Sequence, residues 1–492
     1  MAGERRSVIS YGVPATSSVN GYNSRLIFKR AKLCENNPEF LEEEEEEDRL
    51  SALPDSLLLH ILSFLRTKDV ARTGFLSRRW KFLWTGLSEF DFRDYNQEIG
   101  KICGFINWIG KSLFICRGIY LKKFAVTFYY QDCFASSVNA WIQFVIRNKV
   151  EDVSLHLYSS NNNLYKLPQL MFSNSSFINL SLRNCIIAPP ATMEWKSLKS
   201  LVIEEVELSQ SVIGTTLSGC PVLESLKLKG CWGLRLLDIN TRSLKELVIE
   251  SWKDDSATSV LEIFAPYLRL LSITGYWRGT DCPTFRLIGI PSLVRANLVF
   301  DRYFSPSFLS EASVENVVNY VRALFGNLKD VKELVLGTWF VQVLSVLKMK
   351  GWQLPQYSCK CLTLDAFGHA QSVAGILYML ESSSNLETLV INVKFHPPHE
   401  ARAAVFDLNC DLLQLKTVKI ANIGGQPYPG EPMLKLVQLL LKRAKILEKM
   451  VVDVKEFMES SSTGNSSDYL KIAKTVLSYP RASPKAVVQL CY

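Results

Sequence analysis

A short apolar pattern recurs twelve times between residues 121 and 420, and it restricts the fold more than any other feature of the chain. Each unit has the spacing L-x-x-L-x-L, with other apolar residues allowed. The units are Leu121-Phe124-Val126, Val150-Val153-Leu155, Phe177-Leu180-Leu182, Leu198-Leu201-Ile203, Leu223-Leu226-Leu228, Leu244-Leu247-Ile249, Leu268-Leu271-Ile273, Leu293-Ala296-Leu298, Val331-Leu334-Leu336, Cys359-Leu362-Leu364, Leu386-Leu389-Ile391 and Leu415-Val418-Ile420. One such match is an ordinary helix or strand fragment, whereas twelve in succession indicate a repeat architecture.

Successive units begin 21 to 29 residues apart, except for one interval of 38. This spacing is typical of leucine-rich repeats, in which each unit contributes one short strand and a helical or irregular return. Alternate residues of each strand then point into a shared core, and successive strands pair in parallel along a solenoid. The long interval contains a helical apolar pattern over residues 313–325, closed by Gly326, which predicts a longer return helix.

Residues 48–92 have a different, helical pattern. The apolar residues of the first predicted helix recur at three- and four-residue steps: Leu53, Leu57, Ile61, Phe64 and Leu65. Pro54 suits the first helical position, and Thr67 and Ser77 can cap two further short helices. Because so small a unit is marginal alone, its leucines either pack inside it or form a protein interface.

Residues 1–47 are rich in polar residues and lead into an acidic run, Glu42 to Asp48, so we expect a disordered tail. Two basic clusters, Arg5-Arg6 and Lys29-Arg30-Ala31-Lys32, fit either a nuclear-import signal or an ordinary solvated tail.

The apolar pattern of residues 415–492 predicts a terminal α+β module that covers the open end of the solenoid. Leu434, Val437 and Leu441 trace one stripe of a helix that starts at Pro432, and a second helix is expected near 469–477. We expect the stripe to be buried. The alternative is an open groove for a partner helix.

Composition narrows the class of protein. Hydrophobic residues make up 48% and charged residues 21%, so most of the chain can fold, and the net charge of +8 is too small to imply a nucleic-acid footprint. The twelve cysteines are spread over 492 residues, which favours reduced thiols in the cytoplasm or nucleus. The chain offers no leader-like apolar segment and no window of 18 apolar residues, so neither secretion nor a membrane span is expected.

The outward strand positions of the later units favour a protein partner over nucleic acid, because they are mixed and only weakly charged. A small-molecule pocket stays open as an alternative. These positions are Val202, Lys227, Val248, Ser272, Asn297, Val335, Thr363, Val390 and Lys419.

No enzyme signature is present. The five histidines fit no catalytic motif, and the chain has no phosphate-binding glycine loop or nucleophile elbow. A zinc site can be imagined, but no C-x-x-C pair has finger spacing, so we predict no metal and no cofactor. The imagined ligands are His396, His399, Cys410, Cys359 and Cys361.

Residues 48–92 closely resemble the F-box of plant proteins, above all in Leu53-Pro54-Asp55, Ile61-Leu62-Ser63-Phe64-Leu65 and Leu76-Ser77-Arg78-Arg79-Trp80. The segment LSGCPVLESLKLKGC at 217–231 looks like their leucine-rich units, and residues 415–451 with 479–490 look like the FBD module of such chains. The expected fold is therefore α/β: an F-box (48–94), a leucine-rich-repeat solenoid with a parallel sheet (95–414) and an FBD-like α+β cap (415–492).

The resemblance implies a non-enzymatic substrate-recognition adaptor of an SCF-type cullin-RING ubiquitin ligase. The F-box would dock on the Skp-type adaptor, which connects it to cullin and RING subunits, and the repeats would bind an unknown protein substrate. The residues carried over for adaptor docking are Leu53, Pro54, Leu57, Leu58, Ile61 and Leu65, with Val70 and Trp80 supporting or joining them.

Two positions depart from the family pattern: Arg66 stands where proline is usual, and Gly74 where serine is frequent. These two departures put the affinity of the F-box for the Skp-type adaptor in doubt. The alternative hypothesis is a leucine-rich-repeat scaffold that binds partners without engaging a ligase.

Overall fold

The computed structural model describes residues 50, 52–116, 120–159, 163–253, 260–275, 285–300, 311–394, 411–423, 431–453 and 466–491. The chain divides into two compact units, Met1–His60 and Ile61–Tyr492. The expected tail at 1–47, with its two basic clusters, lies outside the described residues.

Three short helices begin the described chain, as the sequence predicts: α2 (Asp55–Ser63), α3 (Thr67–Thr73) and α4 (Trp80–Leu83), the last followed by the 3-10 turn η1 (Trp84–Gly86). The predicted caps are wrong. The residues that precede α3 and α4 are Arg66 and Arg79, and neither makes a side-chain capping bond. Pro54 lies just outside α2, where its carbonyl accepts the first helical hydrogen bond, from the Leu58 N–H at 3.1 Å.

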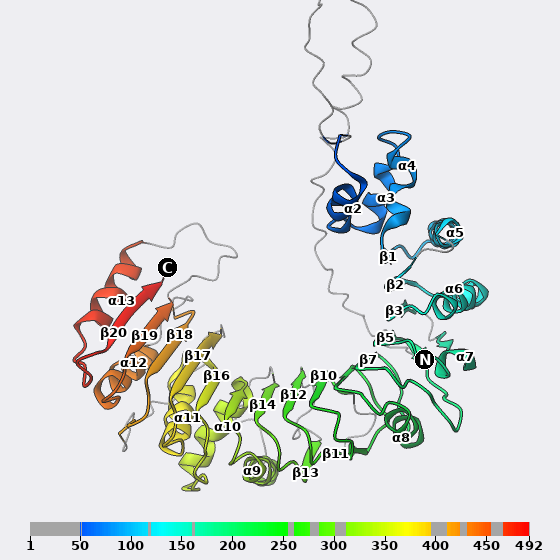
Figure 1. The fold of residues 1–492 in the computed structure, drawn as a ribbon. Helices are drawn as coiled ribbons and strands as arrows, with labels where there is room; N and C mark the ends of the chain where they lie inside the picture. The colour runs from blue at the N-terminus through cyan, green and yellow to red at the C-terminus, as the bar shows by residue number, and fades with distance from the viewer. Residues whose placement is uncertain are drawn as a thin grey trace, which may run out of the picture. The chain divides into compact units, whose positions relative to one another are not determined.

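A parallel sheet of fifteen strands organises the second unit (Figure 1). Its strands, in spatial order, are β1 (Glu89–Arg93), β2 (Lys123–Tyr129), β3 (Asp152–Tyr158), β5 (Asn179–Arg183), β7 (Ser200–Glu204), β8 (Ser225–Lys229), β10 (Glu246–Glu250), β12 (Leu270–Gly275), β14 (Arg295–Phe300), β15 (Glu333–Leu336), β16 (Cys361–Phe367), β17 (Thr388–Lys394), β18 (Thr417–Ala421), β19 (Lys449–Asp453) and β20 (Val487–Cys491). All twelve predicted repeat units fall on strands of this sheet, the first on β2 and the last on β18. The prediction of leucine-rich repeats is therefore confirmed. β1, β19 and β20 extend the sheet at both ends.

The repeat leucines form the core because strand residues alternate between the two faces. In β8, Leu226 and Leu228 are completely buried, and Leu223, the first leucine of that unit, is 1% exposed. The register repeats from strand to strand, so that Leu226 pairs with Leu201 on one side and with Leu247 on the other. Each such side chain contributes roughly 1.5 to 3 kcal/mol of burial free energy.

The return segments carry most of the helices, and these lie along one side of the large sheet (Figure 1). They are α5 (Ile99–Ile115), α6 (Ala135–Arg147), α7 (Gln169–Phe172), α8 (Gln210–Ser218), α9 (Glu311–Asn327), α10 (Thr338–Met349), α11 (Ala370–Glu381), α12 (Glu431–Arg443) and α13 (Ser466–Ser478). Helix α9 is the return helix expected in the 38-residue interval. Elsewhere the returns include short strands: β4 (Tyr165–Lys166) pairs with β6 (Cys185–Ile186), and β11 (Leu261–Phe264) lies between β9 (Leu236–Asp238) and β13 (Phe285–Ile288).

A left-handed residue ends several strands in the same way. Asn184, Glu205, Gly230 and Ser251 directly follow β5, β7, β8 and β10, with φ between 49° and 58°. The N–H of each donates to a carbonyl at the end of the next strand, for example Glu205 to Lys229 at 2.8 Å. The backbone ladder therefore continues for one residue before the chain turns away, which accounts for the uniform strand ends.

Helices α10 and α11 form the tightest helix pair. Ten consecutive residues of α10, Thr338 to Leu347, are buried, and α10 also packs on β14 and β16. Gly375 of α11 lies directly against the carbonyl of Val341 in α10, where an added Cβ would overlap the oxygen. A glycine is needed at this crossing.

The C-terminal segment continues the array. β18, β19 and β20 belong to the same parallel sheet, with α12 and α13 as their return helices. The expected burial of the α12 stripe is confirmed, because Val437 and Leu441 are buried and Leu434 is half-buried. The cap is thus built from further units of the solenoid, of which β20 is the last strand.

Candidate functional site

The first three helices of the described chain, α2, α3 and α4, expose an unusual amount of apolar side chain. Two stripes run along α2: Leu58 and Leu62 are 0% and 1% exposed, whereas Leu57 and Ile61 are 49% and 40% exposed. Further large apolar side chains are exposed at Phe64, Leu65, Phe75, Leu76 and Phe82. Soluble proteins rarely leave so many large apolar residues in contact with water unless a partner covers them.

The residues predicted to dock a partner separate into two groups. Pro54, Leu57, Ile61 and Leu65 are exposed, and Leu53 is half-buried. Leu58, Val70 and Trp80 are buried, at 0%, 0% and 5% exposed. Their side chains are not available at the surface, so they can act only by supporting it. For Val70 and Trp80 this is one of the two roles expected, support or direct contact, and for Leu58 direct contact had been expected.

The sequence did not predict that three further apolar side chains, Phe75, Leu76 and Phe82, are exposed. Phe75 is 92% exposed, Leu76 68% and Phe82 56%. Phe82 lies in α4, and Phe75 and Leu76 lie in the turn before it. Helix α4 has only four residues and cannot bury two faces, and its length becomes known only from the structure.

The two departures from the F-box pattern fit the local backbone. Arg66 has φ −68° and ψ 144°, a conformation that proline also adopts, so arginine changes the side chain there and leaves the backbone as it is. At Gly74, an added Cβ would lie 3.1 Å from the Ala71 carbonyl oxygen and 3.4 Å from the Lys81 backbone. Glycine therefore permits the end of α3 to approach α4 closely.

The helix α3 is attached directly to the sheet. The hydroxyl oxygen of Thr67 accepts a hydrogen bond from the Asp91 N–H in β1 at 2.8 Å. On either side of Asp91, Phe90 and Phe92 are buried, and the ring of Phe92 packs edge-on against Trp108 of α5, with centroids 5.0 Å apart. Only Leu87 and Ser88 separate η1 from β1, so no linker lies between α3–α4 and the first strand.

The outward strand positions form one continuous row, as predicted. Each residue of the row pairs in register with the next one. Val202 pairs with Lys227 and Lys227 with Val248, and the row continues through Ser272 and Asn297 to Lys419. The row is not a basic stripe, because Lys227 and Lys419 are its only cations and Lys227 Nζ lies 2.6 Å from Glu250 Oε1. Its mixed polar and aliphatic character is suited to a protein surface.

A tyrosine cluster, which the sequence reasoning missed, lies at the β1 end of this open face. Tyr158 contacts Tyr129 and Tyr95, with ring centroids 5.4 and 6.1 Å apart, and the Arg183 guanidinium lies 4.4 Å from the Tyr158 ring centroid. Glu204 is 3.4 Å from the same guanidinium. The feature that brings these side chains together is the strand register, because Tyr129 of β2 pairs with Tyr158 of β3.

His156 lies on the same face of the sheet beside this cluster, where it pairs in register with Arg183. Its Nε2 is 2.8 Å from the Ser181 hydroxyl. Burial lowers the pKa of His156, the Glu204 carboxylate opposes this shift, and the Arg183 guanidinium reinforces it. The imidazole is therefore neutral at physiological pH and acts as a hydrogen-bonding group.

Metal ligation and membrane insertion find no support in the part of the chain that the structure describes. Within those ranges, no three His, Cys, Asp or Glu side chains converge as metal ligands, and no helix has the length and hydropathy needed to cross a bilayer. His396, His399 and Cys410 lie outside the described residues. Nine described cysteines are free thiols.

Comparison with known families defines the class. Residues 50–92 match the F-box domain, and residues 116–282 match the family described as At1g61320/AtMIF1, LRR domain. The helical region and the parallel repeat array are therefore those of an F-box protein with leucine-rich repeats.

Curated relatives cover most of the chain. The putative F-box/LRR-repeat protein At3g18150 of Arabidopsis thaliana is 30% identical over 420 residues, which are 82% of this chain and 86% of the relative. The FBD-associated F-box protein At5g22730 of the same plant is 27% identical over 469 residues, 90% of this chain and 94% of the relative. The chain belongs to the F-box/LRR-repeat family.

Proposed function

We propose that the protein is the substrate-recognition adaptor of an SCF-type cullin-RING ubiquitin ligase, acting in the cytoplasm or nucleus. The F-box helices dock on the Skp-type adaptor, which connects them to cullin and RING subunits, and the repeats hold a protein substrate. Its contribution to the reaction is proximity, because tethering raises the concentration of substrate lysines near an active site on other subunits.

The exposed apolar side chains of the F-box helices carry this proposal. Burying side chains such as Leu57, Ile61 and Leu65 at an interface is worth on the order of 1 to 2 kcal/mol each, since about half of each is already covered. A few such anchors dominate the affinity of a typical interface. Leu58, Val70 and Trp80 support the helices from inside.

The test is capture of a purified Skp-type adaptor by the full-length chain. Leu57→Asp combined with Leu65→Asp places two charges on the exposed side of the F-box helices, and we expect affinity to fall by about 100-fold or more. Leu413→Asp is the matched control, because Leu413 is an exposed leucine (55%) that lies far along the chain from the F-box. Unchanged capture by the double variant would overturn the docking assignment, and failure of the native chain to capture the adaptor would favour the scaffold hypothesis.

The open face of the sheet is the proposed substrate surface. Tyrosine and arginine are enriched among the residues that dominate binding energy, and both kinds lie together beside the F-box end of the sheet, in Tyr95, Tyr129, Tyr158 and Arg183.

We propose further that residues 415–492 are an FBD module. The resemblance in sequence and the FBD-associated relative support this assignment.

A further inference from the structure

A pocket of about 570 Å³ opens between α3, the loop that follows β1 and the first half of α5. Four of its lining residues are cations: Lys68 and Arg72 from α3, Arg93 from the end of β1, and Lys101 from α5. Asp94 is the one carboxylate among the lining residues, and its Oδ1 is engaged within its own loop by the Asn96 N–H at 3.0 Å. We call this site the basic pocket.

The cations of the basic pocket differ in how firmly they are held. Arg93 is bound by Asp91 through two hydrogen bonds, one of them from Arg93 Nε to Asp91 Oδ1 at 2.8 Å, whereas Lys68, Arg72 and Lys101 are exposed. Arg72 pairs with Asp69 at 3.2 Å and Lys101 pairs with Glu98 at 2.8 Å, and every side chain in these two pairs is at least half exposed. Exposed ion pairs of this kind contribute only about 0 to 1 kcal/mol, so exchanging them for pairs with an anionic ligand costs little.

The basic pocket also offers an apolar surface. Phe105 and Trp108 line it from α5, and Ala71 lines it from α3. Phe75, which is 92% exposed, lies at the same pocket. A large apolar side chain of a ligand can therefore be covered by aromatic rings while neighbouring carboxylates meet the cations.

We propose that the basic pocket binds a segment of the protein substrate in which an aromatic or large aliphatic residue adjoins several carboxylates. This inference rests on the proposed function, and it names the chemistry of the substrate. Charge complementarity supports it. Lys68, Arg72 and Lys101 are exposed cations on two different helices, and the ion pairs of Arg72 and Lys101 are exposed as well. Cations spread in this way suit an extended acidic segment better than a single compact anion, while Arg93 stays bound to Asp91.

The binding test uses the full-length chain and fluorescently labelled peptides in an anisotropy titration. One peptide carries a phenylalanine followed by four glutamates, the second replaces the glutamates with glutamines, and the third replaces the phenylalanine with serine. We expect the first to bind at least ten-fold more tightly than either of the others, with an affinity that falls as salt is raised. Equal binding of the glutamine peptide would overturn the proposal.

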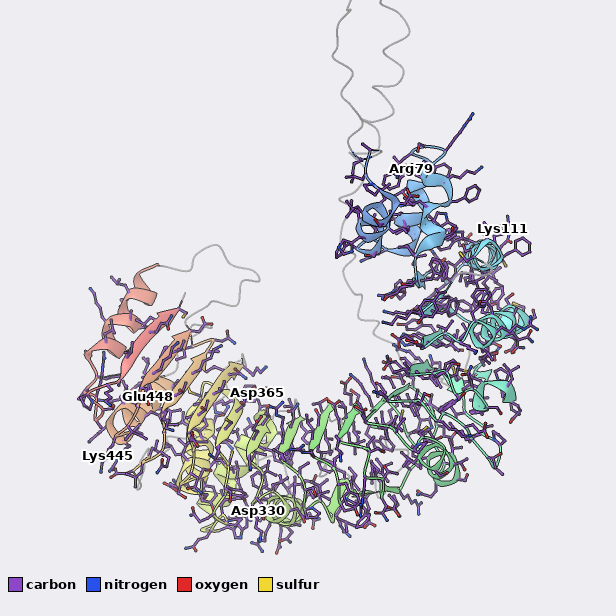
Figure 2. All side chains as sticks on the ribbon, in the orientation of Figure 1. Arg79, Lys111, Asp330, Asp365, Lys445 and Glu448 are labelled. Atoms are coloured by element: carbon purple, nitrogen blue, oxygen red, sulfur yellow. The ribbon has the colours of Figure 1, made fainter. Side chains whose placement is uncertain are left out.

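Substitutions then locate the site. Lys68→Glu combined with Lys101→Glu should weaken binding of the first peptide by about ten-fold or more. Lys111→Glu is the matched control, because Lys111 is an exposed lysine on the same helix, α5, that does not line the pocket (Figure 2). Phe75→Ser tests the apolar part without a change of charge and should also weaken binding. Weakening by Lys111→Glu that equals half the effect of the double variant, in free energy, would show diffuse attraction and overturn the site.

Two other occupants are distinguished in the same assay. If replacing Glu42 to Glu47 with glutamine in the full-length chain tightens peptide binding ten-fold, the chain's own acidic run competes and a substrate segment is not the occupant. If saturating Skp-type adaptor displaces the peptide, the pocket belongs to the adaptor interface. Adaptor capture is measured separately, so its failure and the failure of peptide binding remain distinct results.

Discussion

Thr67 and Asp91 are joined by a hydrogen bond of 2.8 Å that links the first residue of an F-box helix to the first strand of the repeat sheet. The donor is the backbone N–H of Asp91 and the acceptor is the Thr67 hydroxyl oxygen. Thr67 is 5% exposed, so water cannot easily replace the hydroxyl. A side chain that sequence alone assigns to helix capping thus attaches α3 to β1.

Replacing this hydroxyl should loosen the attachment. Thr67→Val keeps the volume but leaves the Asp91 N–H without its acceptor, which costs about 1 to 3 kcal/mol. We expect faster hydrogen exchange of the Asp91 amide and a lower melting temperature. Thr85→Val is the control, because the Thr85 hydroxyl bonds to the Phe82 carbonyl at an exposed site and its loss should cost less than about 0.5 kcal/mol. Unchanged exchange at Asp91 would contradict the role assigned to Thr67.

Alanine should have opposite effects at two helical glycines. Gly375→Ala forces a Cβ against the Val341 carbonyl and should destabilise the α10–α11 pair by about 1 to 3 kcal/mol. Gly104→Ala in α5 meets no atom within 4 Å and should stabilise by about 0.5 to 1 kcal/mol, since alanine has the higher helix propensity. Thermal unfolding of both variants measures the difference. A shift of the same sign in both would show that the helix crossing is not as close as described.

The cysteines should differ sharply in reactivity. Burial raises the pKa of the Cys185, Cys220, Cys231 and Cys359 thiols to about 12, so these carry almost no thiolate at neutral pH. Cys103 and Cys133 are exposed. Brief treatment of the native protein with iodoacetamide at pH 7.5, followed by peptide mass spectrometry, should find these two alkylated first among the nine cysteines that the structure describes. Early modification of any of the four buried thiols would mean that its repeat opens readily.

Acidification should weaken the solenoid through His156. Its folded-state pKa is lowered, so as pH falls through roughly 6.5 the unfolded chain takes up a proton that the folded chain resists, and stability declines. The imidazole faces Arg183 and Arg93, which oppose its protonation, and Glu204 and Asp91, which favour it. We expect the melting temperature of the native protein to fall between pH 7.5 and 5.8 by more than that of His156→Gln. Equal falls would assign the pH dependence to other groups.

The strands were predictable where a single spacing repeats. Positions such as Leu226 and Leu228 obey the alternation of a half-buried strand, and recurrence removed the ambiguity of each short motif. β1 was hidden because its residues lie at the end of the F-box segment. α10 was missed because Trp339, Phe340 and Val341 are all buried, and a helix that is covered on every side has no apolar period.

The candidate site was predictable only in part, because exposure depends on neighbours that the sequence does not place. Leu57 and Leu58 have the same chemistry, yet one is 49% exposed and the other completely buried. The tyrosine cluster depends on the register of β2 and β3. The basic pocket brings together Lys68 and Lys101, which are far apart in sequence, and no local pattern connects them.

Uniform register has a consequence for how chains of this kind change length. Each inner strand bonds only to its two neighbours, so losing one whole unit between β7 and β14 would leave every remaining strand an equivalent partner. Such a loss would shorten the path along the sheet by about 4.8 Å, the spacing of one strand. The separation between a surface on the later repeats and the F-box end of the sheet can therefore be adjusted in discrete steps, while the chemistry at either position stays the same.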